Sequence, residues 1–379
     1  MKIAVAHDWL QTWAGAEQVL QELLAIYPSA EVFTLVDFLD AAYRERLGGA
    51  RVHTTFVQRL PGARHGFRKY VPLFPRAIES FDLSGFDVIV SNSHAVAKGV
   101  RTTPRQLHVS YCYTPMRYAW DLRDEYLEQV GLSRGVRAQA ARYLLERLRR
   151  WDRAASARVD SFVAISSYIA ERIARAYSRR AHVVYPPVRV GARVLDAGER
   201  RAYVTLSRLV PYKRIDVLAH AFRALPDREL VVIGEGPERS RLEALAPRNV
   251  RFLGFVQDAE RDRLLASARA FVFAADEDFG LAPLEAQAQG TPVIAYARGG
   301  VCETITGLDS AAPTGVLFAE QTAECVAQAI RTFEREAARI AEGACVANAK
   351  RFSVERFRAE FAARVELDRE AFLRNAAIA

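Results

Sequence analysis

Short apolar segments alternate with longer segments of helical period along this chain, and the alternation occurs twice. A strand that is buried on both faces reads as a short apolar run, and helices between such strands cover a parallel sheet. We therefore predict an α/β fold of two doubly wound domains. The predicted strands lie at residues 3–9, 86–93, 108–114, 161–166 and 182–187 in the first half, and at 202–207, 229–236, 250–255, 270–275 and 292–297 in the second.

The boundary between the two domains is expected near residues 186–200, because Pro186-Pro187 closes the first set of strands and no clear strand follows at once. Ser353 can cap a last helix, and the apolar stripe of that helix, beginning at Phe357, needs a surface to cover it. The predicted domains are residues 1–190 and 191–352, followed by a terminal helix at 353–379.

The positive charge of the chain lies in its first half. The net charge is +8 over 379 residues; residues 1–190 hold 27 Lys and Arg against 18 Asp and Glu, and the remainder holds 26 against 27. A basic half suggests an anionic partner, such as nucleic acid, membrane headgroups or a phosphorylated substrate, and an arginine-rich composition without any partner is the alternative.

Other classes of protein are disfavoured by what the sequence does not contain. No apolar run is long enough to span a membrane, and the N-terminus does not read as a signal peptide. Four cysteines without a CxxC pair support neither a disulfide framework nor a structural zinc site, and they fit a reducing cytoplasm.

The most informative polar residues lie at 270–288, where a predicted strand, a loop and a helix follow one another. Glu277 in the loop could accept hydrogen bonds from sugar hydroxyls, and Glu285 in the first turn of the helix could accept them from a ribose. Gly280 allows a close backbone approach, and the free N–H groups of a helix that opens at a strand end suit an anion. Alternatively, Glu285 only complements the helix dipole and Glu277 is a solvated loop residue.

Seven residues lie between these two glutamates. The pair, in the setting EDFGLAPLEAQAQGTPVIA, resembles the glutamate pair of retaining GT-B glycosyltransferases of the family-4 type. SRLVPYKRID resembles the family's basic phosphate motif, which places Arg208 and Lys213 on the donor diphosphate. WAGAEQVL resembles its glycine-rich loop, with Ala14 in place of the first glycine, and VVIGEGPE and VRFLGFV look like two further landmarks. The donor-binding residues implied are Gly15, Gly234, Phe255, Val256, Phe279, Gly280, Leu281 and Glu285.

The resemblance covers nearly the whole chain and implies a GT-B architecture. Two Rossmann-like domains would face a cleft, the first binding the acceptor and the second the nucleotide sugar, with the terminal helix returning to the first. It also implies retention of anomeric configuration, by a same-face substitution in which the departing diphosphate oxygen takes the acceptor's proton. Arg208 and Lys213 could neutralise that diphosphate, so we expect no essential metal and no other cofactor. The D-x-D spacing of Asp276 and Asp278 is the competing sign of Mg²⁺ or Mn²⁺.

In the first half, His94 follows a predicted strand, and the resemblance places a histidine here beside the donor sugar. We count it with Arg208, Lys213 and Glu277 as a catalytic-site residue. The stretch TPMRYAWD is familiar from bacterial mannosyltransferases of this family and favours GDP-mannose. Aromatic and charged side chains here could line the acceptor site, although an ordinary packed loop is as good an interpretation, and Asp8 could be either a cap or an acceptor contact. The candidate acceptor residues are Asp8, Tyr113, Arg117, Tyr118, Trp120 and Asp121.

Two basic segments with interleaved apolar residues, 59–78 and 133–158, could bind an anionic membrane surface, with Phe67, Phe74 or Trp151 in the interface. The alternative is a solvated helix that packs its apolar side on the core, and no motif supports nucleic acid. We expect a cytoplasmic enzyme, peripheral at the inner leaflet, that acts on a glycan or a polyprenyl-pyrophosphate-linked acceptor in surface-polysaccharide assembly.

Two other functions on the same fold stay open. A nucleotide-sugar epimerase would need an acid/base pair that is not evident beyond Glu277 and His94. A catalytically inactive nucleotide-sugar-binding scaffold would have no need of the intact basic and acidic motifs. A nicotinamide dehydrogenase is disfavoured, because no GxGxxG follows the first strand of either half.

Overall fold

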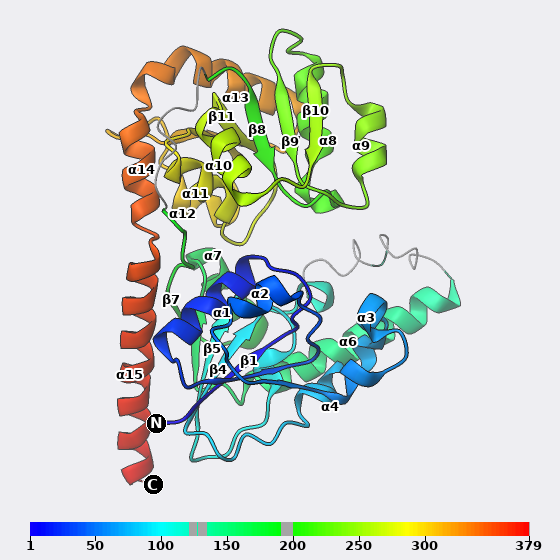
Figure 1. Cartoon of the computed structure of the whole chain (residues 1–379), viewed down its shortest axis with the longest axis vertical. Helices are drawn as coiled ribbons and strands as arrows, with labels where there is room; N and C mark the ends of the chain where they lie inside the picture. Colours follow the sequence, from blue (N-terminus) through cyan, green and yellow to red (C-terminus); the bar gives the residue numbers. More distant parts are fainter. Residues whose placement is uncertain (121–126, 128–134, 191–199, 379) are drawn as a thin grey trace. The chain divides into compact units, whose positions relative to one another are not determined.

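The computed structural model describes residues 1–120, 127, 135–190 and 200–378. The chain divides into two compact units, the first formed by Met1–Pro187 with Phe357–Ala379 and the second by Val188–Arg356. Each unit contains a parallel sheet with flanking helices (Figure 1), which confirms the predicted α/β class.

Seven of the described strands form the first sheet, in the order β3-β2-β1-β4-β5-β6-β7, and each neighbouring pair is parallel. The order reverses between β1 and β4, and in such sheets ligands bind at the carboxyl ends of the strands beside this switch point. The strands are β1 (Ile3–His7), β2 (Glu31–Thr34), β3 (Val52–Thr54), β4 (Val88–Ser93), β5 (Leu107–Cys112), β6 (Ser161–Ala164) and β7 (Ala181–Val183).

The helices of the first unit form where apolar residues recur on one side. α1, for example, buries Val19, Leu20 and Leu23, and Ser166 caps α7 by accepting the backbone N–H of Ile169. The α-helices are α1 (Gly15–Ile26), α2 (Ala41–Glu45), α3 (Ala63–Gly66), α4 (Phe74–Ile78), α6 (Val136–Ser156) and α7 (Ser167–Tyr177), and the 3₁₀ helices are η1 (Phe56–Arg59), η2 (Phe67–Leu73), η3 (Ala97–Gly99) and η4 (Arg117–Ala119).

Six of the described strands form the second sheet, in the order β10-β9-β8-β11-β12-β13, again with parallel pairing throughout. Its switch point lies between β8 and β11. Both faces of the sheet are covered. The consecutive residues Tyr203 and Val204 of β8 point to opposite faces, and they belong to two separate buried clusters. The strands are β8 (Tyr203–Leu206), β9 (Leu230–Ile233), β10 (Val250–Gly254), β11 (Ala270–Phe273), β12 (Val293–Tyr296) and β13 (Gly315–Phe318).

The helices of the second unit connect these strands and close the unit. They are α8 (Ile215–Arg223), α9 (Arg239–Leu245), α10 (Asp258–Ala266), α11 (Leu281–Ala288), α12 (Val301–Thr304), α13 (Ala323–Glu336) and α14 (Glu342–Lys350), with the 3₁₀ helices η5 (Pro211–Lys213) and η6 (Ala337–Arg339).

The chain returns to the first unit through a long last helix, α15 (Val354–Ile378), as the sequence predicted. The hydroxyl of Ser353 accepts the backbone N–H of Arg356, which caps the helix. Phe357 and Phe361 are fully buried, and the ring of each stands edge-on to Tyr111 at 5.6 Å. The apolar stripe of the helix therefore belongs to the core of the first unit.

The two places where the chain passes between the units are hydrogen-bonded to each other. The backbone N–H of Val188 donates to the carbonyl oxygen of Phe352 at 2.8 Å, and Val188 forms a parallel bridge with Ser353. The predicted boundaries at 190 and 352 lie close to these residues, and residues 191–199 of the predicted linker lie outside the described part of the chain.

Candidate active site

The basic loop and the glutamate loop of the second unit meet at its switch point. Arg208 and Lys213 follow β8, and Glu277 follows the neighbouring strand β11. The ammonium of Lys213 forms a hydrogen-bonded ion pair with Oε1 of Glu277, and their side chains are 14% and 20% exposed. Arg208 is exposed on the same loop. The structure therefore brings predicted diphosphate and sugar ligands to one strand edge, where a nucleotide sugar could meet them.

The basic loop is held in place by the segment that follows β9. The backbone N–H of Leu209 donates to the backbone carbonyl oxygen of Glu235 at 2.9 Å. A Cβ atom at Gly234 would overlap the carbonyl oxygen of Ser207. Gly236 is constrained in the same way against Leu209. Gly234 thus has a packing reason to be glycine, and its predicted contact with the donor stays a prediction.

The loop that carries Glu277 is fixed by two glycines after β12 that sequence analysis did not single out. The backbone N–H of Gly300 donates to the carbonyl oxygen of Glu277 at 2.8 Å, and Gly299 forms a parallel bridge with the same residue. A Cβ at either glycine would overlap the backbone of residues 277–279. A Gly-Gly pair shortly after a buried strand was the available signal, since only glycine permits so close a backbone approach.

Gly280 opens α11 in a left-handed conformation, with φ 89°, which favours glycine. Glu285 lies in the second turn of this helix, not in the first as predicted, because the helix begins at Leu281. Burial raises the pKa of Glu285, and the neighbouring guanidinium of Arg261 only partly opposes this. Arg261 also forms an ion pair with Asp262, in which Nη2 lies 2.8 Å from Oδ1. The side chain of Glu285 is half-buried. Burial therefore disfavours the ionised carboxylate, which is the form that would accept hydrogen bonds from a ribose.

The remaining predicted donor residues differ in what they expose. Phe255, directly after β10, is 63% exposed, and Val256 is half-buried. Phe279 is 3% exposed and packs on Phe352 with ring centroids 5.6 Å apart, so a donor could meet only its backbone. Leu281 is half-buried at the start of α11.

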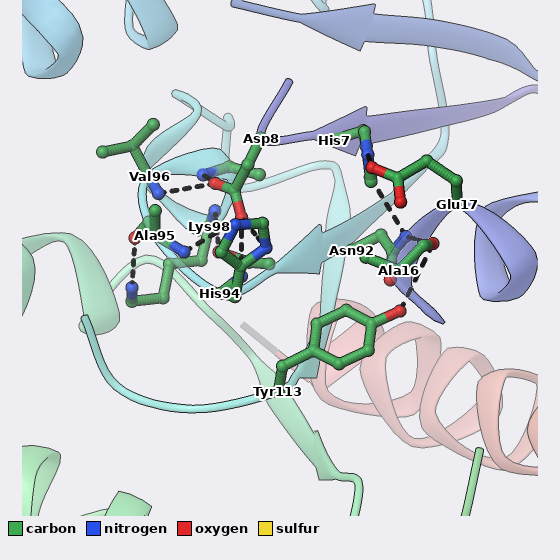
Figure 2. Close-up of polar contacts among 12 residues, drawn as sticks. His7, Asp8, Ala16, Glu17, Asn92, His94, Ala95, Val96, Lys98 and Tyr113 are labelled. Carbon is green, nitrogen blue, oxygen red and sulfur yellow. Dashed lines mark hydrogen bonds and ion pairs between the residues drawn. The ribbon is translucent and has the colours of Figure 1, made fainter. Parts of the chain in front are cut away.

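In the first unit, Asp8 and His94 meet at the other switch point, after β1 and β4 (Figure 2). Nδ1 of His94 lies 3.0 Å from Oδ2 of Asp8. Oδ2 also accepts the backbone N–H groups of His94 (2.6 Å) and Ala95 (2.9 Å), and Oδ1 accepts those of Val96 (2.6 Å) and Ala97 (2.7 Å). Asp8 is fully buried. Of its two predicted roles the structure supports the cap, and the acceptor contact is wrong because both carboxylate oxygens are buried and occupied.

This contact changes the ionisation of both residues. Burial alone would raise the pKa of Asp8, but the charge of His94 and the hydrogen bonds hold that pKa well below its usual value. Burial alone would lower the pKa of His94, but the Asp8 carboxylate outweighs it and raises that pKa. The ring of Trp9 meets the imidazole edge-on at 4.6 Å. Asp8 therefore favours a cationic imidazole whose Nδ1 is occupied, which leaves Nε2 for a ligand.

A second polar network lies beside the start of α1 (Figure 2). Nδ2 of Asn92 lies 3.1 Å from Nδ1 of His7 and donates to the carbonyl oxygen of Ala16 at 3.0 Å. Glu17 accepts the backbone N–H of Ala14 at 2.9 Å, and its other oxygen lies 3.4 Å from Nε2 of His7. Gly15, the predicted donor contact, is the first residue of α1, so the helix N-terminus to which it belongs is fixed from β1 and β4.

The predicted acceptor segment divides in two. The ring of Tyr113 lies 6.3 Å from that of His94, so the structure brings these two candidates together. The indole of Trp120 instead donates to the buried carboxylate of Asp152 at 2.8 Å, which fits the packed-loop alternative. Arg117 and Tyr118 are half-buried in η4 beside the core of the first unit, and Asp121 lies outside the described residues.

The prediction that Phe67, Phe74 or Trp151 enters a membrane interface is wrong. Phe67 and Phe74 are buried in the core, and Trp151 donates its indole N–H to Glu79 at 2.7 Å while its ring packs on Gly99. Their aromatic spacing reflects core packing. Arg64, Arg76, Arg147 and Arg150 are exposed, and so is Tyr143 of α6, at 65%. Arg158 is instead half-buried and pairs with Glu79 at 2.8 Å. No helix in the described part of the chain is long and apolar enough to cross a membrane.

The D-x-D spacing does not form a cluster of metal ligands. Oδ2 of Asp276 pairs with Nε of Arg298 at 3.0 Å, and Asp278 is 8% exposed. Among residues 1–120, 127, 135–190 and 200–378, the structure shows no group of three or more His, Cys, Asp or Glu side chains that could hold a metal ion.

One family model matches this chain, within its second unit. The model of the family described as "Glycosyl transferases group 1" matches residues 193–352. A GDP-mannose-dependent monoacylated alpha-(1-6)-phosphatidylinositol monomannoside mannosyltransferase of Corynebacterium glutamicum is 40% identical over 115 residues, which are 26% of this chain and 30% of that protein. A GDP-mannose-dependent alpha-(1-6)-phosphatidylinositol dimannoside mannosyltransferase of Mycobacterium tuberculosis is 41% identical over 123 residues, 32% and 31% of the two chains. The matches thus span about a third of these curated relatives.

Solved structures match nearly the whole fold at low identity. Anabaena Alr3699/HepE in complex with UDP is 20% identical, with a TM-score of 0.68 over 97% of this chain and 100% of that one. Sucrose-phosphate synthase from Thermosynechococcus elongatus is 18% identical, with a TM-score of 0.71 over 98% and 100%. The fold is that of GT-B glycosyltransferases, and the second unit resembles the family of group 1 glycosyl transferases.

Proposed function

We propose that this chain is a retaining glycosyltransferase that moves a hexose from a nucleotide sugar, mannose from GDP-mannose being the best candidate, onto a lipid-linked or glycan acceptor. The observation that carries the proposal is the pairing of Lys213 with Glu277 at the switch point of the second sheet. A lysine that binds diphosphate and a carboxylate that accepts from sugar hydroxyls are then adjacent, as a sugar diphosphate requires.

The proposed step transfers charge to the leaving group. The bond between the anomeric carbon and the diphosphate oxygen breaks, the acceptor oxygen bonds to that carbon from the same face, and the acceptor proton passes to the departing oxygen. Arg208 and Lys213 stabilise the diphosphate as its charge grows. Glu277 orients both the sugar and Lys213, and Glu285 binds the ribose. We propose that two cations serve in place of a metal, so that the reaction has no essential metal or cofactor.

The choice of donor rests on two lines of support that point differently. The relatives with the higher identity are named as GDP-mannose-dependent enzymes. The solved neighbours include complexes with UDP and UDP-glucose, at about half that identity. We favour GDP-mannose because the relatives with the higher sequence identity are named as dependent on it. The exposed Phe255 after β10 is a candidate surface for the base.

The acceptor is proposed to be anionic and lipid-linked, such as a polyprenyl-pyrophosphate glycan of surface-polysaccharide assembly. Two observations support this. The relatives named above act, by their names, on phosphatidylinositol mannosides. The excess of basic residues lies in the first unit, where α6 exposes Arg147 and Arg150 beside Tyr143. We propose a peripheral location at the cytoplasmic leaflet, with a nucleotide sugar and an anionic membrane as partners and no nucleic acid.

One experiment separates this function from its alternatives. The full chain is screened by thermal shift against GDP-mannose, UDP-glucose, GDP and UDP, and the best donor is then incubated without acceptor. A glycosyltransferase releases free sugar and nucleoside diphosphate slowly. An epimerase converts the sugar while it stays attached, and a scaffold does neither. Glu277→Gln should abolish the release, whereas Arg251→Ala on the exposed face of β10 should not. Absence of any stabilisation or release would contradict the proposal.

A further inference from the structure

A fully buried ion pair lies behind the turn that carries His94. Lys98 belongs to η3, directly after that turn, and Asp152 belongs to α6. Nζ of Lys98 lies 2.5 Å from Oδ1 of Asp152, and both side chains have no exposed surface. The proposed mechanism gives neither residue a contact with donor or acceptor, so the pair needs an explanation of its own.

Each charge of the pair has further partners. Oδ2 of Asp152 accepts the indole N–H of Trp120 at 2.8 Å and the hydroxyl of Tyr177 at 2.6 Å. Nζ of Lys98 donates to the carbonyl oxygen of Ala95 at 2.8 Å and lies 5.6 Å from the ring of Tyr177. The pair therefore connects the His94 turn to α6, to α7 and to the loop after β5.

Stability alone does not explain this arrangement. Removing two charges from water carries a desolvation penalty that their attraction often fails to offset, and apolar residues of similar size are commonly as stabilising. What a buried pair supplies, and an apolar pair does not, is direction. The ammonium of Lys98 donates a hydrogen bond to the Ala95 carbonyl oxygen and forms an ion pair with Oδ1 of Asp152, and the two contacts coexist only in a narrow range of positions.

The turn at residues 94–97 is thus held from two sides. Asp8 accepts its four backbone N–H groups, and Lys98 donates to the carbonyl oxygen of Ala95 (Figure 2). We propose that Lys98 and Asp152 are positioning residues, which fix the turn so that the imidazole of His94 stays aligned with Asp8. The consequence for catalysis rests on the proposed function, and the alignment itself does not.

The experiment compares two variants of the full chain. Lys98→Met/Asp152→Asn removes both charges, so no unpaired charge stays buried, and the asparagine oxygen can still accept from Trp120 or Tyr177. Gln106→Met is the matched control. Gln106 is also buried, and its Nε2 donates to the backbone carbonyl oxygens of Leu83 (2.5 Å) and Phe86 (2.8 Å). It lies directly before β5, at the amino ends of the strands, whereas His94 lies at the carboxyl ends.

Two readouts are taken from each variant. The pKa of His94 is measured by NMR, with His94→Gln used to assign its signal, and kcat is measured with the donor that the thermal screen selects. In the double variant we expect the pKa of His94 to fall towards 6.5, because its alignment with Asp8 loosens. We expect kcat to fall at least about tenfold with little change in the KM for the donor, since small displacements reduce rates strongly. Both values should stay unchanged in Gln106→Met.

The outcomes separate this proposal from the proposed function. A folded double variant with the wild-type pKa of His94 overturns the positioning role, whatever its activity. A shifted pKa in a protein whose wild type transfers no sugar supports the positioning role and contradicts the proposed function. If the double variant does not fold, Lys98→Gln/Asp152→Asn, which keeps both buried positions polar and neutral, is examined in the same way, and an unchanged pKa of His94 there overturns the proposal.

Discussion

The carboxylate of Asp8 binds both the side chain and the backbone of His94. One of its oxygens, Oδ2, lies 3.0 Å from Nδ1 of His94 and also accepts the backbone N–H of His94 at 2.6 Å. A cap that also binds the imidazole couples the conformation of the turn to the charge of the ring. The first prediction tests that coupling.

Asp8→Asn should destabilise the first unit by about 2–5 kcal/mol, because the amide can accept with only one of the two atoms that accept backbone N–H groups in Asp8, so buried donors are left unpaired. Denaturant unfolding measures the loss. Asp82→Asn is the matched control, since Asp82 also accepts a backbone N–H, that of Ser84 at 3.0 Å, but is exposed. A loss no greater than that of the control would contradict the assignment of Asp8.

The same pair predicts how stability depends on pH. The folded-state pKa of Asp8 is lowered, so its contribution is present above the unfolded value near 4 and is lost as the pH falls below it. The folded-state pKa of His94 is raised, so its contribution is complete below about 6.5 and is lost as the pH rises through the folded value. The stability difference between wild type and His94→Gln should therefore shrink from pH 6 to pH 9.

Lys213→Ala and Arg208→Ala should each lower kcat by roughly a hundred- to a thousandfold without unfolding the protein, because each removes a charged donor from a group that becomes more anionic as the reaction proceeds. Arg251→Ala serves as the control, since this exposed arginine lies on β10 of the same sheet. Transfer by purified Lys213→Ala at nearly the wild-type rate would show that the diphosphate assignment is wrong.

The two glutamates should separate in calorimetry with the nucleoside diphosphate alone. Glu285→Gln should weaken its binding, because the proposed partner of Glu285 is the ribose. Glu277→Gln should lower turnover with a modest change in that affinity, because its proposed partner is the sugar. An equal loss of affinity in both variants contradicts this division.

Glu285→Gln should also be more stable than the wild type at neutral pH. A glutamate with a raised folded-state pKa destabilises the fold when it is ionised, so removing the charge relieves that effect. The difference should disappear below about pH 4, where both side chains are neutral in both states. Thermal unfolding at several pH values measures this. A wild type that is the more stable protein at pH 7 would contradict it.

Activity should survive EDTA, because we propose that Arg208 and Lys213 neutralise the diphosphate in place of a metal. Transfer by the untreated and chelated enzyme is compared, with Mg²⁺ and Mn²⁺ added back. Complete loss that is restored by either ion would favour the Asp276–Asp278 interpretation over the two cations.

Liposome flotation tests the proposed membrane contact. Binding should require anionic lipid, weaken at high salt and fall when Arg64, Arg68 and Lys69 are changed to Glu, since each basic residue near such a surface contributes about 1 kcal/mol. The control changes Arg239, Arg241 and Arg263 of the second unit, of which Arg241 and Arg263 are exposed, in the same way. If the wild type ignores anionic liposomes at low salt, a soluble acceptor becomes the better proposal.

Sequence reasoning found the elements that have a clear local signal. Ten apolar strands and the periodic helices were found, whereas β2, β3 and β13 were not predicted, although strands as short as these, such as β7 and β8, were. The Lys213 and Glu277 loops were found through motif resemblance. Their pairing follows from the adjacency of β8 and β11, which strand order supplies.

Buried polar residues were the least predictable part. Lys98 reads in sequence as a surface lysine, and only its contact with Asp152, on a distant helix, explains its burial. Phe67, Phe74 and Trp151 read as possible membrane contacts for the opposite reason, because spacing on one element does not reveal which other element covers it.

The hydrogen-bonded crossing at Val188 and Phe352 has a consequence for how such a protein can change. The second unit is one uninterrupted stretch of chain, and both of its ends lie side by side, so in topological terms it is an insertion within the first unit. The first unit also requires the helix that follows this stretch, since Phe357 and Phe361 of α15 pack on Tyr111 in its core. The stretch 188–356 can therefore be exchanged as a single segment without dividing the core of the first unit.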